Sequence, residues 1–256
     1  MDKKVALITG ASSGIGRDMA RDLAARGYNL ILVSRDEQKL SELKKEFNVE
    51  VTVIAMDLRN SENCKKLHKE VQNKFGNIDI LINNAGFGEF GFFTETNLDK
   101  EINLINTNIT AVHVLTKLFL KDMQKVNKGN ILNVSSISGF LPGPLMAAYY
   151  SSKAYVLRLS QSLREELKKQ NSNVKISVLC PGPVNTNFNN VAGVKFGLHS
   201  FTSERVAKYT IDKMLNNKFL IIPGVTIKSI AVLSKIVPSV ILSKFVYKAQ
   251  RKKDKK

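Results

Sequence analysis

Two side chains in the segment 149–153 have the types and the spacing of an acid–base pair. Tyr149 and Lys153 stand four residues apart in a stretch whose pattern predicts a helix, so both side chains lie on one helical face. A free tyrosine has a pKa of about 10, and a neighbouring ammonium favours the phenolate and lowers that pKa. Tyr150 has no such partner, because Ala154 stands four residues after it. The pair predicts proton transfer by Tyr149, although this spacing also arises by chance on exposed helices.

A glycine-rich segment, TGASSGIG at 9–16, follows a short apolar run and leads into a predicted helix. Gly10 permits a tight turn, Gly14 allows the backbone to approach a pyrophosphate, and Gly16 permits close packing of the helix on the strand. The amino end of that helix offers free N–H groups and the positive end of its dipole to phosphates. Glycines can also serve only as turns, but a strand before and a helix after favour a dinucleotide site.

The same segment resembles a known family. TGASSGIG has three residues between its first two glycines, and it is similar to the motif of the short-chain dehydrogenase/reductase family. NNAG at 83–86, the tyrosine–lysine pair and PG at 181–182 match further motifs, and the resemblance covers about residues 3–222. It implies a nicotinamide-dependent enzyme that interconverts a ketone and its secondary alcohol. A cofactor-binding sensor on the same fold is the alternative, and the tyrosine–lysine pair disfavours it.

The resemblance also implies roles for the reacting groups. Ser136 closes NVSS, thirteen residues before Tyr149, and matches the serine that hydrogen-bonds the substrate oxygen. Tyr149 then exchanges the proton, while hydride passes between the nicotinamide and the carbonyl carbon. Lys153 is expected to bind the nicotinamide ribose and to lower the pKa of Tyr149.

An asparagine is expected as the fourth catalytic residue, in the helix before the strand that ends near Ser136. Asn108 matches best, because Thr110 and Ala111 follow it, whereas Asn103 and Asn106 lack that context. Its backbone would hold a water that connects the lysine to solvent. The alternative is a helix asparagine satisfied by solvent.

The residues after the second predicted strand bear on the choice of dinucleotide. An NAD site needs a carboxylate there to accept a hydrogen bond from the ribose hydroxyl. The matching position, seven residues after Gly27, is Ser34, and Arg35 follows it. Serine leaves room for a 2′-phosphate, and a guanidinium offers it forked donors. We therefore expect NADP(H) rather than NAD(H), although Ser13 occupies the place of a second basic residue and Arg35 could be a solvated loop charge.

Other motif positions complete the expected cofactor site. Asp57 matches the adenine contact, NNAG the floor under the adenosine ribose, and the segment after PG the carboxamide contacts. No metal site is expected. The resemblance implies the cofactor-binding residues Gly10, Ser12, Ser13, Gly14, Ile15, Gly16, Arg35, Asp57, Leu58, Asn84, Ala85, Gly86, Tyr149, Lys153, Pro181, Gly182, Val184 and Thr186.

Alternating elements must position these side chains. Short apolar runs predict strands, amphipathic stretches with helix-start signals at Asp36, Ser61 and Ser203 alternate with them, and Gly27 and Gly76 predict helix ends. The order implies an α/β fold with a doubly wound, Rossmann-like parallel sheet of about seven strands and helices on both faces. Ligands bind such sheets at the carboxyl ends of the strands. The predicted strands are 5–9, 30–33, 51–56, 78–82, 130–135, 174–179 and 219–222.

Phenylalanines are concentrated in two loops near the expected cleft, one after NNAG and one after PG. Phenylalanine is most often a core residue, but this concentration in loops favours an apolar substrate, such as a long-chain ketone, a 3-oxoacyl thioester or a steroid-like ring. The eight phenylalanines in or beside the expected cleft are Phe87, Phe90, Phe92, Phe93, Phe140, Phe188, Phe196 and Phe201.

The C-terminal residues 225–256 differ from the rest of the chain, so we expect a catalytic domain at 1–224 and a basic extension. The 256-residue chain has a net charge of +17, and nine basic residues and one aspartate give this segment +8 of it. Two amphipathic stretches separated by Pro238 resemble a membrane-surface anchor, or they cover the sheet edge or the cleft.

Composition limits the remaining function classes. A hydrophobic fraction of 43% fits a folded globular chain, and no apolar run is long enough for a membrane span or a signal peptide. Cys64 and Cys180 are expected to be reduced core thiols. No motif for reading nucleic acid accompanies the basic tail. We expect a cytoplasmic homodimer or homotetramer, peripheral at the inner membrane surface if the tail anchors it.

Overall fold

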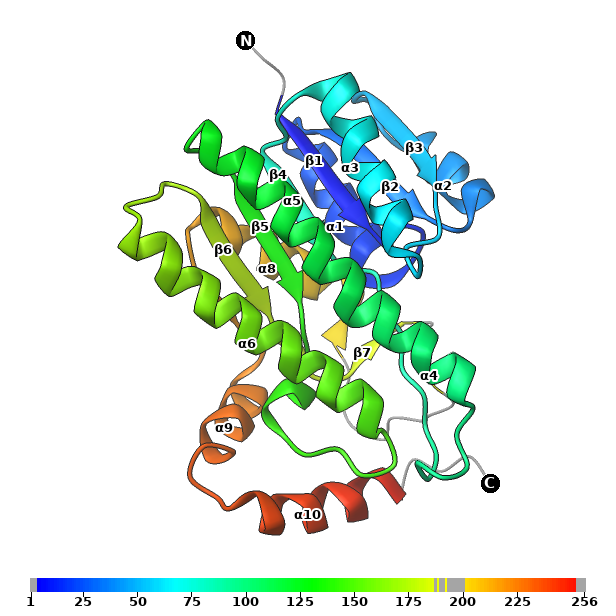
Figure 1. Cartoon of the computed structure of the whole chain (residues 1–256), viewed down its shortest axis with the longest axis vertical. Coiled ribbons are helices and arrows are strands. Elements are labelled where there is room, and N and C mark those ends of the chain that lie inside the picture. Colours follow the sequence, from blue (N-terminus) through cyan, green and yellow to red (C-terminus); the bar gives the residue numbers. More distant parts are fainter. Residues whose placement is uncertain (1–3, 187, 189–191, 193–200, 252–256) are drawn as a thin grey trace.

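Seven strands form one parallel sheet at the centre of the structure, a computed structural model that describes residues 4–186, 188, 192 and 201–251 (Figure 1). The order β3-β2-β1-β4-β5-β6-β9 places the switch of direction between β1 and β4. Each predicted strand is confirmed to within two residues at either end. The strands are β1 (Val5–Thr9), β2 (Asn29–Ser34), β3 (Val51–Ala55), β4 (Ile80–Asn83), β5 (Asn130–Val134), β6 (Lys175–Leu179) and β9 (Leu220–Ile221), and β7 (Val184–Asn185) pairs separately with β8 (Phe201–Thr202).

Helices cover both faces of the sheet, as predicted (Figure 1). One face carries α1 (Gly14–Ala25), α2 (Glu37–Lys44) and α8 (Ser203–Leu215). The other carries α3 (Ser61–Phe75), α5 (Val112–Lys125) and α6 (Ala147–Lys169). The remaining helical elements are α4 (Leu98–Ile105), a π-helical turn (Asn106–Ala111), a 3₁₀ turn (Ile137–Phe140), α9 (Val225–Leu233) and α10 (Ser239–Arg251).

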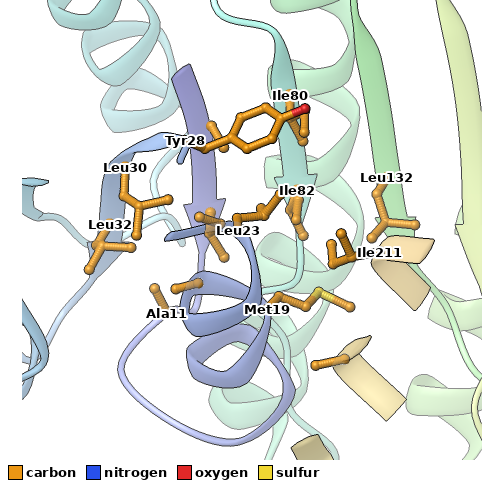
Figure 2. Packing of buried hydrophobic residues seen from close by; sticks show 14 of the residues in the cluster. Ala11, Met19, Leu23, Tyr28, Leu30, Leu32, Ile80, Ile82, Leu132 and Ile211 are labelled. Carbon is orange, nitrogen blue, oxygen red and sulfur yellow. The ribbon is translucent and has the colours of Figure 1, made fainter. Parts of the chain in front are cut away.

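The core lies in two layers, because successive side chains of each strand point to opposite faces of the sheet. Ile8 belongs to the cluster on the face covered by α1 and α2. Met19 and Leu23 of α1 lie in the same cluster, together with Leu32 and Ile82 of the sheet (Figure 2). Leu7 lies on the opposite face, in the layer that contains α3 and α5. Both faces of the sheet are therefore buried, which explains why the strand sequences are almost continuous apolar runs.

The helix-start signals were right at one of three positions. The side chain of Asp36 accepts a hydrogen bond from the amide of Lys39 and caps α2. The caps of α3 and α8 are Asn60 and Thr202, each one residue before the predicted serine. In both cases two adjacent residues can cap a helix, and the extended backbone of the first decides which one does.

A buried polar network joins the strands next to the switch point. The amide of Asn83 on β4 donates to Thr116 Oγ1 at 2.9 Å and to Asn133 Oδ1 at 2.8 Å. The amide of Asn133 on β5 donates in turn to Ser160 Oγ at 3.1 Å. These bonds tie two strands to α5 and α6, and so hold the carboxyl ends of the strands in register.

The C-terminal segment forms two helices with Pro238 between them, as predicted. Ala231 and Ile227 of α9 pack in a small cluster with Leu157 of α6. A Cβ added at Gly182 would lie 2.5 Å from Ile227 Cδ1, so α9 also contacts the loop after β6 closely. Among the residues that the structure describes, no helix has the length and apolar character needed to cross a bilayer.

Candidate active site

A cleft of about 1130 Å³ lies at the carboxyl ends of the strands. Eighteen of the twenty predicted site residues line it. The two exceptions, Gly16 and Asn108, are buried next to the cleft rather than in its lining; Gly16 allows the close packing expected of it, and the parts of both residues in ligand binding stay predictions. The cleft therefore joins segments that lie far apart in the sequence, as a switch point in a parallel sheet requires.

The loop after β1 has the geometry of a phosphate site. Gly10 and Gly14 have φ of 65° and 55°, a backbone conformation that favours glycine. A Cβ at Gly16 would lie 2.3 Å from Asn84 Nδ2, so only glycine lets α1 approach the end of β4 this closely. Ser13 makes no side-chain cap on α1, and the first turn of α1 has no acidic residue. The amino end of α1 therefore keeps donors and positive potential for an anion.

Basic side chains surround the far end of the cleft, beyond β2 and β3. Arg35 lines it, as predicted, and so do Lys39 and Arg59, which the motifs did not indicate. The Arg59 guanidinium binds both oxygens of Asp57 and holds the pKa of that carboxyl below its usual value. Lys39 pairs with Asp36 at 2.7 Å. The sequence signal that could have indicated Lys39 is its position four residues after Arg35, at the start of a predicted helix.

Ser136 and Tyr149 meet in the middle of the cleft. Tyr149 hydrogen-bonds the hydroxyls of Ser136 and Ser138, and Ser138 also donates to Ser136 Oγ at 2.6 Å. Burial raises the pKa of Tyr149, and the two serines offset only part of that rise. The phenol is therefore the protonated form at neutral pH, which suits a proton donor. Ser138 was missed because a serine in the loop after a strand is common, and no motif distinguishes it from Ser136 two residues earlier.

Lys153 lies directly behind Tyr149, with 5% of its surface exposed. Its Nζ donates to the Val134 carbonyl at 2.9 Å and lies 5.8 Å from the centroid of the Tyr149 ring. Burial lowers the pKa of Lys153 to about 8. Burial is the main cause of the raised pKa of Tyr149, and the Lys153 ammonium points at a backbone carbonyl. The expected lowering of the Tyr149 pKa by Lys153 stays a prediction.

Asn108 is completely buried in the π-helical turn. Its amide donates to the Phe87 carbonyl at 2.9 Å and to Ser152 Oγ at 3.0 Å, and its Oδ1 accepts from the Phe87 amide at 3.1 Å. The solvent-satisfied alternative is therefore wrong. Of its competitors, Asn103 lines the cleft and Asn106 begins the π-helical turn. Asn108 holds the loop after β4, and its expected water remains a prediction.

The phenylalanine prediction was right only in part. Phe87 and Phe188 line the cleft, and Phe90 packs beside it on Met146. Phe140 and Phe201 do not line the cleft and pack in other apolar clusters. Phe92 and Phe93 are exposed, and Phe196, like Val191, Val194 and Leu198, lies outside the described residues.

Three more residues in the wall had no motif to reveal them. Met146 and Tyr150 extend it from the start of α6, and Gln250 reaches it from α10, about a hundred residues further along the chain. Their proximity depends on the path of the C-terminal helices, which no local pattern encodes.

The two cysteines are buried and free. Burial raises the pKa of the Cys64 thiol to about 11 and that of Cys180 to about 12, so both fit core thiols rather than nucleophiles. Within the described part of the chain, no three metal-ligating side chains are grouped to hold an ion.

Known proteins resemble the chain in sequence and in structure. The family described as short chain dehydrogenase matches residues 4–203. The very-long-chain 3-oxoacyl-CoA reductase of Rattus norvegicus is 38% identical over 174 residues, which are 64% of this chain and 55% of that protein.

Two solved structures share the whole architecture. A short chain dehydrogenase/reductase from Burkholderia phymatum in complex with NAD has a TM-score of 0.83 at 27% identity, over 91% of this chain and 92% of that one. A short-chain dehydrogenase from Sphingobium yanoikuyae in complex with NADPH has a TM-score of 0.81 at 29% identity, over 91% and 93%. With the match over most of its length, the chain belongs to the short-chain dehydrogenase family and is an oxidoreductase.

Proposed function

We propose that the protein uses NADP(H) to interconvert an apolar ketone and its secondary alcohol. The observation that carries the proposal is the meeting of Tyr149, Ser136 and Lys153 in one cleft, next to a loop built for phosphates. A structural role alone does not account for a lysine that is 5% exposed and faces a tyrosine in a ligand-sized cleft.

The residues divide the chemistry between them. A bound nicotinamide would supply or accept the hydride. Ser136 holds the substrate oxygen by a hydrogen bond, and Tyr149 donates the proton to that oxygen in reduction, since its raised pKa keeps it protonated at neutral pH. Lys153 would hold the ribose of the dinucleotide and carry charge behind Tyr149. Asn108 keeps the loop at Phe87 in place beside them.

The choice of NADP(H) rests on charge at the far end of the cleft. Ser34 stands where an NAD site needs a carboxylate, and its hydroxyl is engaged with the backbone of Asp36. Arg35, Lys39 and Arg59 all line this end. Lys39 and Arg59 are paired with Asp36 and Asp57, so Arg35 supplies the excess positive charge that favours a 2′-phosphate over a free hydroxyl.

The apolar character of the substrate rests on the other end of the cleft. Met146, Phe188 and the rings of Tyr149 and Tyr150 form its wall. The similarity to a very-long-chain 3-oxoacyl-CoA reductase supports a lipid-like carbonyl compound, such as a 3-oxoacyl thioester.

The direct test is NADPH oxidation against a panel of ketones of increasing chain length. We expect kcat/KM to rise with length from 2-butanone to 2-decanone, because each buried methylene adds roughly 0.8 kcal/mol of binding. Steady-state absorbance at constant NADPH measures it, with glyceraldehyde as a polar control. No turnover of any ketone, or equal turnover of polar and apolar compounds, would contradict the proposal.

We further propose that α9 and α10 contact an anionic lipid surface. Val225, Val240 and Phe245 are largely exposed on these helices, and Ile236 is largely exposed in the segment between them. Lys228, Lys235, Lys244 and Lys248 lie among them, and the last lysines of the chain follow. Exposed apolar side chains interspersed with cations are typical of helices that lie in a membrane interface.

The division of the chain at residue 224 and an assembly of two or four copies stay predictions.

Vesicle flotation tests the membrane contact. Phe245→Glu is expected to reduce binding to phosphatidylglycerol vesicles at least about fivefold, because it removes an apolar anchor and repels the anionic surface. Phe93→Glu is a matched control, since Phe93 is 68% exposed and Phe245 66% exposed. A point substitution is preferable to deletion of 225–256, because Ile227 and Gln250 have internal contacts. Equal flotation of Phe245→Glu and wild type would exclude α10 as the anchor.

A further inference from the structure

Ser138 lies in the part of the cleft that holds the proposed proton donor, although no motif indicates it. It stands in the 3₁₀ turn after β5, is 4% exposed and lines the cleft. Its Oγ lies 2.6 Å from Ser136 Oγ, and its backbone amide donates to the same oxygen at 3.2 Å. Tyr149 hydrogen-bonds both serines. Three hydroxyls therefore meet where the substrate oxygen is expected to bind.

The Ser138 hydroxyl holds no other part of the fold. Within the described residues, its hydrogen bonds go only to Ser136 and Tyr149. The nearby Ser152 differs, because its Oγ donates to the backbone carbonyl of Tyr149 at 2.7 Å and so secures the first turn of α6. The side chain of Ser152 thus serves the backbone, whereas that of Ser138 contacts only the groups that are expected to react with the substrate.

The 3₁₀ turn holds Ser138 in a fixed position beside α6. The amide of Ile137 donates to the Pro181 carbonyl at 2.9 Å. A Cβ at Gly139 would lie 2.7 Å from the carbonyl oxygen of Lys153, so the turn packs directly on the backbone of α6. The Ser138 hydroxyl is therefore placed relative to the same helix that carries the proton donor.

A bound ketone would decide the direction of the hydrogen bond between the two serines. A ketone oxygen only accepts, so Ser136 must donate its one hydroxyl proton to it. Across the 2.6 Å contact, only the Ser138 hydroxyl then has a proton left to donate. The Ser138 amide occupies the other lone pair of Ser136 Oγ. This count of protons holds whichever serine donates before the substrate binds.

We infer that Ser138 is a positioning residue, whose hydroxyl donates to Ser136 Oγ while Ser136 donates to the substrate oxygen. This inference rests on the proposed function for the identity of that oxygen. With both lone pairs of Ser136 Oγ occupied, its proton is directed at the substrate, and a hydroxyl that accepts hydrogen bonds donates a stronger one. Ser138 therefore acts on the carbonyl through Ser136.

A double-mutant cycle on NADPH-dependent reduction of 2-octanone tests the inference. We expect Ser138→Ala to lower kcat about tenfold and to leave the Kd for NADPH within about twofold of wild type. Ser136→Ala is expected to lower kcat about 100-fold. The double variant should show no loss beyond that of Ser136→Ala, because Ser138 then has no hydroxyl to position. Losses that multiply to about 1000-fold would overturn the inference, as would wild-type kcat in Ser138→Ala.

The matched control is Ser177→Ala. Ser177 is 2% exposed on β6, its hydroxyl donates to the Lys218 carbonyl at 2.9 Å, and it does not line the cleft. The control therefore also removes one buried, hydrogen-bonded hydroxyl, but at a distance from the proposed chemistry. We expect its kcat to stay within about twofold of wild type. A tenfold fall in both Ser138→Ala and Ser177→Ala would show a general effect of a lost buried hydroxyl and overturn the inference.

Binding without reaction separates this inference from the proposed function. The protein loaded with NADP⁺ cannot reduce a ketone, so calorimetric titration with 2-octanone and with 2-methyl-1-octene, which has C=CH₂ in place of C=O, measures its preference for a carbonyl oxygen. In the wild type we expect a preference for the ketone, which Ser138→Ala lowers about fivefold. That result supports the inference even if the wild type turns over no ketone, and only the proposed function then fails. Ketone turnover with a preference that Ser138→Ala leaves unchanged overturns the inference and leaves the proposed function standing.

Discussion

Tyr149→Phe is expected to lower kcat for NADPH-dependent ketone reduction about 10³-fold and to leave the Kd for NADPH within about twofold of wild type. The substitution removes the proton donor but keeps the ring that packs on Phe188. A positioned general acid contributes about 10² to 10⁴ in rate. Steady-state kinetics and calorimetric titration with NADPH measure the two quantities separately.

The matched control is Tyr150→Phe. Tyr150 lines the same cleft one residue away, and its hydroxyl contacts Gln250 rather than the serines. Its loss is expected to alter KM and to spare kcat. Because burial raises the pKa of Tyr149 and lowers that of Lys153 to about 8, reduction should be independent of pH between about 6 and 7, whereas oxidation of the alcohol, which needs the phenolate, should rise with pH. Equal kcat in Tyr149→Phe and wild type would refute the assignment.

Arg35→Asp is expected to raise the Kd for NADPH about 100-fold and to change the Kd for NADH little. The substitution exchanges a cation for an anion where a 2′-phosphate would lie, and a carboxylate there can accept from a free ribose hydroxyl. Fluorescence titration with both dinucleotides measures the change.

Arg158→Asp is the charge-matched control, since Arg158 is exposed on α6 and does not line the cleft. It makes the same change in net charge, so a general electrostatic effect would appear in both variants. Unchanged NADPH affinity in Arg35→Asp would remove the basis for the NADP(H) preference.

The sheet could be predicted well from the sequence because each strand is buried on both faces. A short, almost entirely apolar run such as VALIT at 5–9 predicts a strand in the middle of a sheet. The alternation of strands and helices then predicts that neighbouring strands pair in parallel. Helix ends were less certain. Asn60 and Ser61 can both cap α3, and only the extended backbone at Asn60 decides between them.

The site was predictable where a motif lies in one continuous segment. The glycine loop and the Tyr149–Lys153 pair are of this kind, and both line the cleft. Gly16, expected to pack the helix on the strand, and Asn108 lie next to the cleft rather than in its lining, and the motifs alone do not distinguish these positions because burial depends on neighbours from other segments. One reading of the C-terminal segment placed it over the sheet edge or the cleft, but Gln250 itself could not be identified, since its contact with Tyr150 spans 100 residues.

The π-helical turn at Asn106–Ala111 fixes how many residues the chain has between α4 and α5, and this number is as restricted as the residue types. Each residue advances an α-helix by roughly 100°, and a π-helical turn accommodates its extra residue without changing the direction of the helix. Removing one residue here would restore an ordinary helix and keep α4 and α5 in phase, but it would remove the turn that presents Asn108 to the Phe87 loop. Substitutions around Asn108 can be conservative, whereas a deletion of one residue removes the local geometry on which its contact with this loop depends.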